Sequence, residues 1–208
     1  MLALVAYLVW PTWERTQTPA ILADLIEAYR QYVAAVMAGY LDPRQRDPAR
    51  LDDTRIAARL ARTNAEASVA RLCDEPARFA DDLDRAAGLL ANSHRFVHSA
   101  MALEAGLYHG PVSNASAPAA LRVFAADVDT TLCALARTLR DPSYGFDDLP
   151  DLRADQRALR MPRPDEAAGD GPARQGVYPG AVLALETDRV VDSINTMTAL
   201  LRRARSNL

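Results

Sequence analysis

Residues 76–109 read PARFADDLDRAAGLLANSHRFVHSAMALEAGLYH, and their apolar positions recur every three or four residues, the period of an α-helix. Two neighbouring apolar stripes run along this helix: Phe79, Leu83, Leu90, Val97, Met101 and Tyr108 form the first, and Leu89, Phe96, Leu103 and Leu107 form the second. A helix that is apolar over so broad an arc packs against more than one partner. We therefore expect residues 76–109 at the centre of a helical bundle.

The rest of the chain has the same helical period, and no stretch shows the sustained two-residue alternation of a β-strand. Proline and glycine residues between the apolar stripes mark the helix boundaries, and Thr18-Pro19 predicts an N-cap followed by the first helical residue. The expected helices cover about 19–40, 47–75, 76–109, 117–140, 152–159 and 180–203. The fold class is therefore all-α, an antiparallel bundle of about five long helices.

The apolar stripes also predict which side chains are buried. In the first of these helices the buried stripe is Leu22, Leu25, Tyr29, Val33, Val36 and Tyr40, and in the second it is Leu51, Ile56, Leu60, Ala67 and Cys73. Cys73 and Cys133 both fall in helical patterns, so we interpret them as small core residues in a reducing compartment.

The N-terminus is an unbroken apolar run from Met1 to Trp10, followed by Pro-Thr-Trp-Glu-Arg. Crossing a bilayer takes about 20 apolar residues, so this run supplies only about half the thickness. Trp10, Trp13 and Arg15 suit the membrane interface, which predicts that residues 1–15 are the end of a transmembrane helix and its exit. A secretory signal fits less well, because no positive charge precedes the run. A short apolar helix packed in a soluble core is the remaining alternative.

Composition limits the possible functions. Of the 208 residues, half are apolar and a quarter are charged, and the net charge is −3. A nucleic-acid partner is not expected, because arginines alternate with acidic residues and form no concentrated basic surface. We divide the chain into the membrane exit (1–15), a helical bundle (16–140), a Pro/Gly-rich loop with one short helix (141–179) and a closing helix (180–208).

No motif predicts catalysis or a cofactor. His94 and His98 lie four residues apart and could share a metal ion, but two ligands do not make a site, and neither Glu-x-x-His nor Cys-x-x-Cys occurs. The chain also lacks a Gly-rich phosphate loop and a Gly-x-Ser-x-Gly elbow. We therefore predict no enzyme activity, no metal and no cofactor.

Several polar residues fall inside helical stretches. They are Asn64 and Glu66 in the second helix and Glu186, Asp188, Arg189, Asp192 and Asn195 in the last. One interpretation is a solvated face with weak salt bridges. The alternative, for Asn64 and Asn195, is a buried hydrogen bond that fixes helix register.

Three segments together resemble the fusaric-acid-resistance (FUSC) family of bacterial inner-membrane proteins, in particular its YccS/YhfK-type members, which are related to aromatic acid exporters. They are the exit LVWPTWER (residues 8–15), RTNAEAS (62–68) and ETDRVVDSIN (186–195). The resemblance implies a cytoplasmic helical region that follows a membrane block, with other parts or copies of a transporter as partners. This sequence lacks the family's membrane blocks, so any translocation path belongs to a longer parent chain or an assembly.

The resulting expectation is a cytoplasmic helical domain at the bacterial inner membrane that supports assembly or gating of a FUSC-like exporter. The alternative is a stand-alone helical scaffold or interaction module. A further hypothesis is a pocket for an aromatic acid, lined by Tyr29, Tyr32, Phe96 and Tyr108, although aromatic residues at helical spacing more often fill a core.

Overall fold

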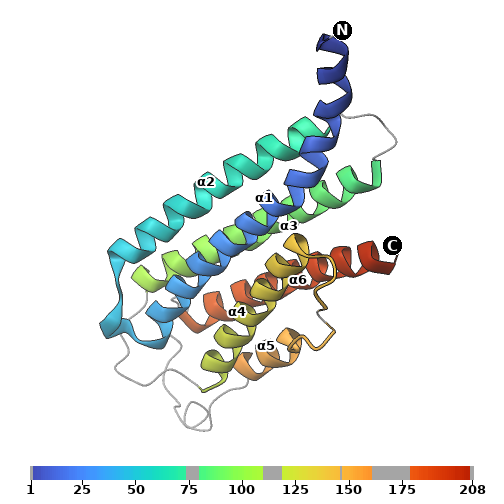
Figure 1. Cartoon of the computed structure of the whole chain (residues 1–208). Coiled ribbons are helices and arrows are strands. Elements are labelled where there is room, and N and C mark those ends of the chain that lie inside the picture. Colours follow the sequence, from blue (N-terminus) through green and yellow to red (C-terminus); the bar gives the residue numbers. More distant parts are fainter. Residues whose placement is uncertain (1, 74–79, 110–118, 146, 161–178, 207–208) are drawn as a thin grey trace, which may run out of the picture.

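The computed structural model describes residues 2–73, 80–109, 119–145, 147–160 and 179–206, and this part of the chain is all-helical. Successive α-helices run antiparallel (Figure 1), which confirms the predicted fold class. The helices are α1 (Leu2–Leu41), α2 (Pro48–Cys73), α3 (Ala80–His109), α4 (Ala119–Arg140), α5 (Leu152–Arg160) and α6 (Pro179–Ser206), with a short 3₁₀ turn η1 (Pro43–Gln45) after α1.

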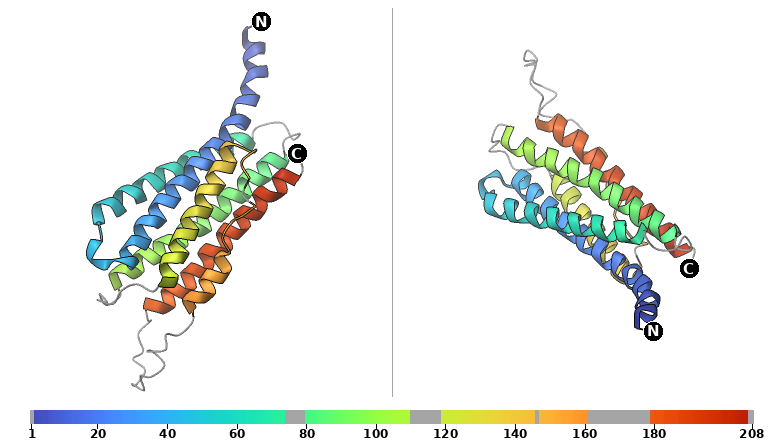
Figure 2. Two further views of the ribbon diagram at one scale, coloured as in Figure 1. Left: turned by 60° about the horizontal axis from the view of Figure 1, so that its bottom comes forward. Right: turned by 90° about the horizontal axis from the view of Figure 1, so that it is seen from above.

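Helix α1 is one continuous element of 40 residues, which differs from the prediction of a separate helix starting at Pro19. Thr18 is not an N-cap; it is buried inside α1, where its hydroxyl lies 2.9 Å from Ser68 Oγ. Proline keeps a helical φ and removes only one hydrogen-bond donor, so a helix can continue through Pro11 and Pro19 with a bend. Figure 1 shows this bend, and Figure 2 shows from two more sides that the first turns of α1 project beyond the bundle.

The centre of the bundle lies along α1. This helix packs against α2, α3 and α4, and it contributes Leu25, Tyr29, Tyr32 and Met37 to the largest fully buried side chains. Helix α3 packs against α6, α1 and α2, which confirms that the helix expected in this region contacts more than one partner. Its placement at the very centre was wrong, because α1 separates α2 from α4 and buries more of its large side chains.

The second stripe of α3, rather than the first, forms most of its core face. Phe96, Leu103 and Leu107 are buried, whereas Met101 and Tyr108 of the first stripe are 46% and 57% exposed. Phe79 lies outside the described residues. Both stripes satisfy the helical period, so only the position of the neighbouring helices decides which one is covered.

The predicted stripe of α2 was wrong except at Leu51, which is buried. Ile56 and Leu60 are each 62% exposed, and Ala67 and Cys73 are exposed as well. Besides Leu51, the face against α1 and α3 holds Ala58, Ala65, Ser68, Val69 and Leu72. Small side chains at Ala58, Ala65 and Ser68 let helix backbones approach closely, which is why the larger residues are not needed there.

Helices α1 and α3 approach each other closely at two glycines. A Cβ added to Gly39 would lie 2.9 Å from Leu107 Cδ1, and one added to Gly106 would lie 2.5 Å from the Tyr40 hydroxyl. That hydroxyl donates a 2.8 Å hydrogen bond to the Leu103 carbonyl oxygen. These contacts at Gly39, Gly106 and Tyr40 hold α1 and α3 in register, next to the hydrogen bonds of Glu104.

Most predicted boundaries are confirmed. Asp47 Oδ1 accepts a hydrogen bond from the Arg50 amide at 3.0 Å, so Asp47 caps α2 as expected. The short helix expected at 152–159 is α5, which packs between α4 and α6. Of the predicted loop at 141–179, residues 146 and 161–178 lie outside the described residues. Within the described part of the chain, no helix has both the length and the hydropathy needed to cross a membrane.

Candidate functional site

The polar residues of α6 point to two different neighbours rather than to one cluster. Asp188 and Asp192 both accept hydrogen bonds from Arg153 of α5, with a distance of 2.5 Å between Arg153 Nη1 and Asp188 Oδ1. Two carboxylates one turn apart therefore hold the short helix α5 against α6. Sequence reasoning missed Arg153 because it lies 35 residues from Asp188 in the chain, with no local signal that links the two.

Glu186 and Arg189 belong to a groove between α3 and α6. Glu186 is buried and pairs with Arg189, whose Nη1 lies 2.8 Å from Glu186 Oε1. The groove has a volume of about 410 Å³ and is lined by both signs of charge, including Arg95 and His98 from α3. Its mixed charge and open shape identify no particular ligand.

Asn64 and Asn195 do not fix helix register through buried hydrogen bonds, because both side chains are exposed. Glu66 has a partner: its Oε1 lies 3.1 Å from His94 Nε2 of α3 and 3.5 Å from Arg62 Nε. Both asparagines lie on the solvent face of their helices, although the helical period places them beside an apolar stripe.

His94 and His98 face different surroundings. His94 reaches Glu66 of α2, whereas His98 lines the groove between α3 and α6. Among the described residues, no group of three or more His, Cys, Asp or Glu side chains could hold a metal ion. Cys73 and Cys133 are free thiols; Cys73 is exposed rather than in the core as predicted, and Cys133 is half-buried.

A buried polar cluster around Glu104 was not predicted. Glu104 of α3 is only 7% exposed and accepts a hydrogen bond from the Tyr32 hydroxyl of α1 and another, at 2.8 Å, from Arg55 of α2. Burial and the bond to Glu104 raise the pKa of Tyr32 above its usual range. One carboxylate thus joins three helices. A signal was present, since Glu104 directly follows Leu103 within the second apolar stripe.

The four aromatic residues predicted to line one pocket do not do so. Tyr29 stacks on Phe96 in the core, with ring centroids 6.1 Å apart. Tyr108 is exposed and lies beneath Arg46, whose guanidinium is 5.4 Å from the ring centroid. Of the four, Tyr29 and Tyr32 line a common small cavity between α1, α2 and α3, and neither Phe96 nor Tyr108 is among the described residues that line it. The expected aromatic-acid pocket is therefore wrong in its composition.

A pair of carboxyl groups marks the contact of α5 with α4. Burial raises the pKa of Asp155 in α5, and a hydrogen bond with Asp127 of α4 and the nearby charge of Asp151 raise it further. A raised carboxyl pKa stabilises the fold below the unfolded pKa of about 4, and this contribution is lost as the pH rises through the folded value.

We expect Asp155→Asn to raise the free energy of unfolding at pH 7, by about 0.5 kcal/mol because the site is partly exposed. Chemical denaturation between pH 4 and pH 8 measures it, and the gain should shrink toward pH 4. Asp148→Asn is the matched control, because it removes the same charge from an exposed position. An equal gain at all pH values would contradict the assignment.

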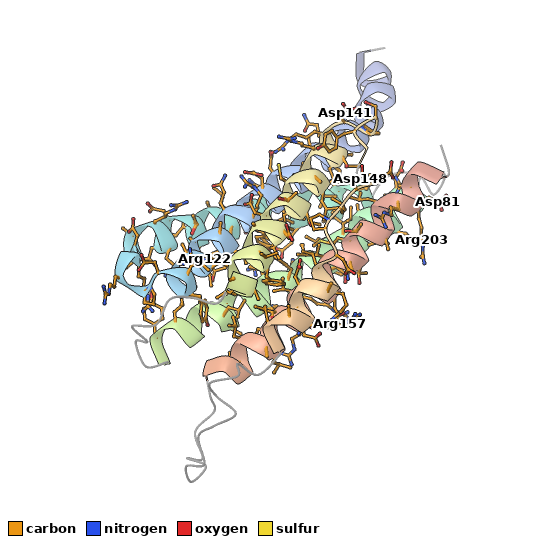
Figure 3. The ribbon with its side chains drawn as sticks, turned by 90° about the horizontal axis from the view of Figure 1, so that it is seen from below. Asp81, Arg122, Asp141, Asp148, Arg157 and Arg203 are labelled. Carbon is orange, nitrogen blue, oxygen red and sulfur yellow. The ribbon has the colours of Figure 1, made fainter. Side chains whose placement is uncertain are left out.

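Other charged side chains surround the bundle. Figure 3 shows Arg122, Arg157 and Arg203 projecting from α4, α5 and α6, and Asp81, Asp141 and Asp148 lie at the surface as well. Their signs are interspersed, so this surface has no concentrated basic patch in the described part of the chain. The side chains of Trp10, Trp13 and Arg15, the predicted membrane-interface residues, lie outside what the structure describes.

Comparison with known proteins adds no assignment: no protein-family model, no curated protein and no solved structure matches this chain.

Proposed function

We propose that this chain is a membrane-attached helical module of a FUSC-like transport protein of the bacterial inner membrane. On this proposal it supports assembly or gating at the cytoplasmic face, with no catalysis and no translocation path of its own. The observation that supports it best is α1, which begins in the apolar N-terminal segment and continues without interruption along the centre of the bundle.

A continuous helix gives such a module a direct mechanical link. A displacement of the N-terminal turns would move α1, and α1 contacts α2, α3 and α4. Helices are rigid elements, so packed neighbours carry the displacement onward. Tyr32 of α1 and Arg55 of α2 both donate hydrogen bonds to Glu104 of α3, so these bonds connect the same three helices.

The sequence resemblance adds support from separate regions. The exit segment of residues 8–15 lies in the projecting turns of α1, and the segments 62–68 and 186–195 lie in α2 and α6. In the last segment, Asp188 and Asp192 position α5, and in the segment of α2, Glu66 contacts α3. These residues therefore have structural roles in the bundle, which suits a module without catalysis.

Vesicle flotation tests the membrane role. We expect the full chain to float with vesicles of phosphatidylethanolamine and phosphatidylglycerol, and a chain without residues 1–13 to stay in the aqueous fraction. Circular dichroism of the shortened chain checks that the bundle still folds. Flotation of a folded, shortened chain, or a full chain that remains a soluble monomer, would contradict the proposal.

A second candidate, a stand-alone interaction module, is favoured by the outer face of α2. Ile56 and Leu60 are largely exposed there, and Leu60 also lines a shallow groove of about 380 Å³ with Ile21, Ala57 and Ala61. Exposed apolar residues on one helix face are typical of a surface that contacts another protein.

Sedimentation of the chain without residues 1–13 tests this candidate, because any self-association then no longer depends on the apolar N-terminus. The interaction module predicts association that Ile56→Ser with Leu60→Ser abolishes. Val123→Ser with Leu185→Ser, which changes two apolar residues of similar exposure on α4 and α6, should leave it unchanged. A monomer at all concentrations would contradict self-association through α2.

A further inference from the structure

A small cavity lies between α1, α2 and α3. Its volume is about 110 Å³, and it is lined by Tyr29, Tyr32, Arg55, Ala58, Arg59, Arg62, Val97 and Met101. That volume exceeds the roughly 10–15 Å³ that one water molecule needs, and it is below the roughly 300–1,000 Å³ of sites for drug-sized ligands. A ligand with only a few heavy atoms would fit.

Two buried donors that belong to this cavity have no hydrogen-bond partner among the described residues. They are the hydroxyl of Tyr29, a fully buried side chain, and Nε of Arg62. Nε of Arg62 is 3.5 Å from Glu66 Oε1, too long for a good hydrogen bond. Buried polar groups normally have partners, and leaving one unpaired is costly. The two donors therefore point to a missing acceptor.

The other polar groups of the cavity are already in use or add positive charge. Tyr32 donates to Glu104, and Arg55 pairs with both Glu104 and Asp52. The guanidinium of exposed Arg59 has no partner among the described residues. Burial raises the pKa of Tyr29 to about 12, so its hydroxyl stays protonated and can donate. Each unmatched group can thus donate a hydrogen bond, and two of them are cationic.

An anion with a short hydrocarbon body matches both halves of this lining. A carboxylate has two oxygens with about four lone-pair sites, enough to accept from Tyr29, Arg62 and Arg59 together. Ala58, Val97 and Met101 form the apolar wall. We propose that the cavity binds a short-chain carboxylate, held by the Tyr29 hydroxyl and the Arg62 guanidinium. The site does not rest on the proposed membrane role.

Titration of the full chain with sodium isobutyrate, followed by calorimetry and NMR chemical shifts, tests the site. We expect saturable binding to the wild type, and affinity about tenfold lower in Tyr29→Phe and in Arg62→Gln, because hydrogen bonds to charged groups are the stronger class. Tyr29→Phe should fold, since it removes only an unpaired hydroxyl. The uncharged isostere isobutyramide should bind far more weakly.

Two control variants separate the site from general effects. Tyr40→Phe removes a hydroxyl bonded to Leu103 outside the cavity, and Arg122→Gln removes an exposed arginine on α4, so both should bind isobutyrate like the wild type. Unchanged affinity in Tyr29→Phe would overturn the proposal. Absence of binding would overturn it too, leaving water as the occupant. Equal affinity for inorganic phosphate would overturn the carboxylate assignment, because phosphate makes no use of the apolar wall.

Discussion

Replacing Phe96 with alanine is expected to lower the free energy of unfolding by about 3–5 kcal/mol, the usual cost of removing a fully buried aromatic side chain. Phe96 is completely buried in α3 and stacks on Tyr29 of α1. The change leaves a cavity at the contact between these two helices, and the surrounding side chains can fill it only in part. Chemical denaturation monitored by circular dichroism measures the loss.

Tyr108→Ala is the matched control on the same helix. Tyr108 is mostly exposed, and its ring makes a cation–π contact with the Arg46 guanidinium. Its replacement should cost less than about 1 kcal/mol. A larger loss for Tyr108→Ala than for Phe96→Ala would mean that the first apolar stripe of α3, not the second, faces the core.

Glu104→Ala is expected to lower the free energy of unfolding by about 3 kcal/mol. The buried Tyr32 hydroxyl would lose its acceptor, Arg55 would lose its partner on α3, and a space would open between three helices. Arg55 is partly exposed and can return to water, so the loss stays below that of a fully buried ion pair. Thermal or chemical denaturation provides the measurement.

A double-mutant cycle isolates the bond between Tyr32 and Glu104. Tyr32→Phe combined with Glu104→Ala should cost less than the sum of the single changes, with a coupling of about 1–2 kcal/mol. Glu186→Ala serves as a control, because Glu186 is similarly buried but pairs with the exposed Arg189 one turn away on its own helix. Strictly additive losses at positions 32 and 104 would show that the bond contributes nothing.

These two predictions concern the same set of helices. Phe96 and Glu104 lie two turns apart on α3, and both contact tyrosines of α1. The small cavity with the unpaired Tyr29 hydroxyl lies at the same junction. A ligand there would bridge α1 and α2, so its binding should stabilise the folded chain, by an amount that grows with the logarithm of the ligand concentration above its Kd.

Local signals predicted helices α2 to α6 closely. Asp47-Pro48 starts α2 with a side-chain cap, and the short α5 begins after Asp151, whose carboxylate accepts hydrogen bonds from the Arg153 and Ala154 amides. Such caps depend on residues three or fewer positions apart, which the sequence displays directly. The same logic failed at Thr18-Pro19, because a proline inside a continuous helix looks locally like a helix start.

The candidate sites depended on contacts between distant residues. Glu104 is 72 residues from Tyr32 and 49 from Arg55, and Arg153 is 35 from Asp188. A single sequence indicates that a charged residue lies near an apolar stripe but not which helix supplies its partner. This is why Glu66, Asp188 and Asp192 were selected without their partners, and why Tyr32 and Glu104 were never paired.

The sequence by itself determined that the chain is all-helical, where most helices begin and end, and that they alternate in direction, because period, caps and short connections are local properties. Only the tertiary structure decided which face of each helix is buried. Both stripes of α3 and both faces of α2 satisfy the helical period, and the covered face is the one that a neighbour can approach. On α2 that face carries Ala58, Ala65 and Ser68, where small side chains permit close packing, and so Ile56 and Leu60 remain outside.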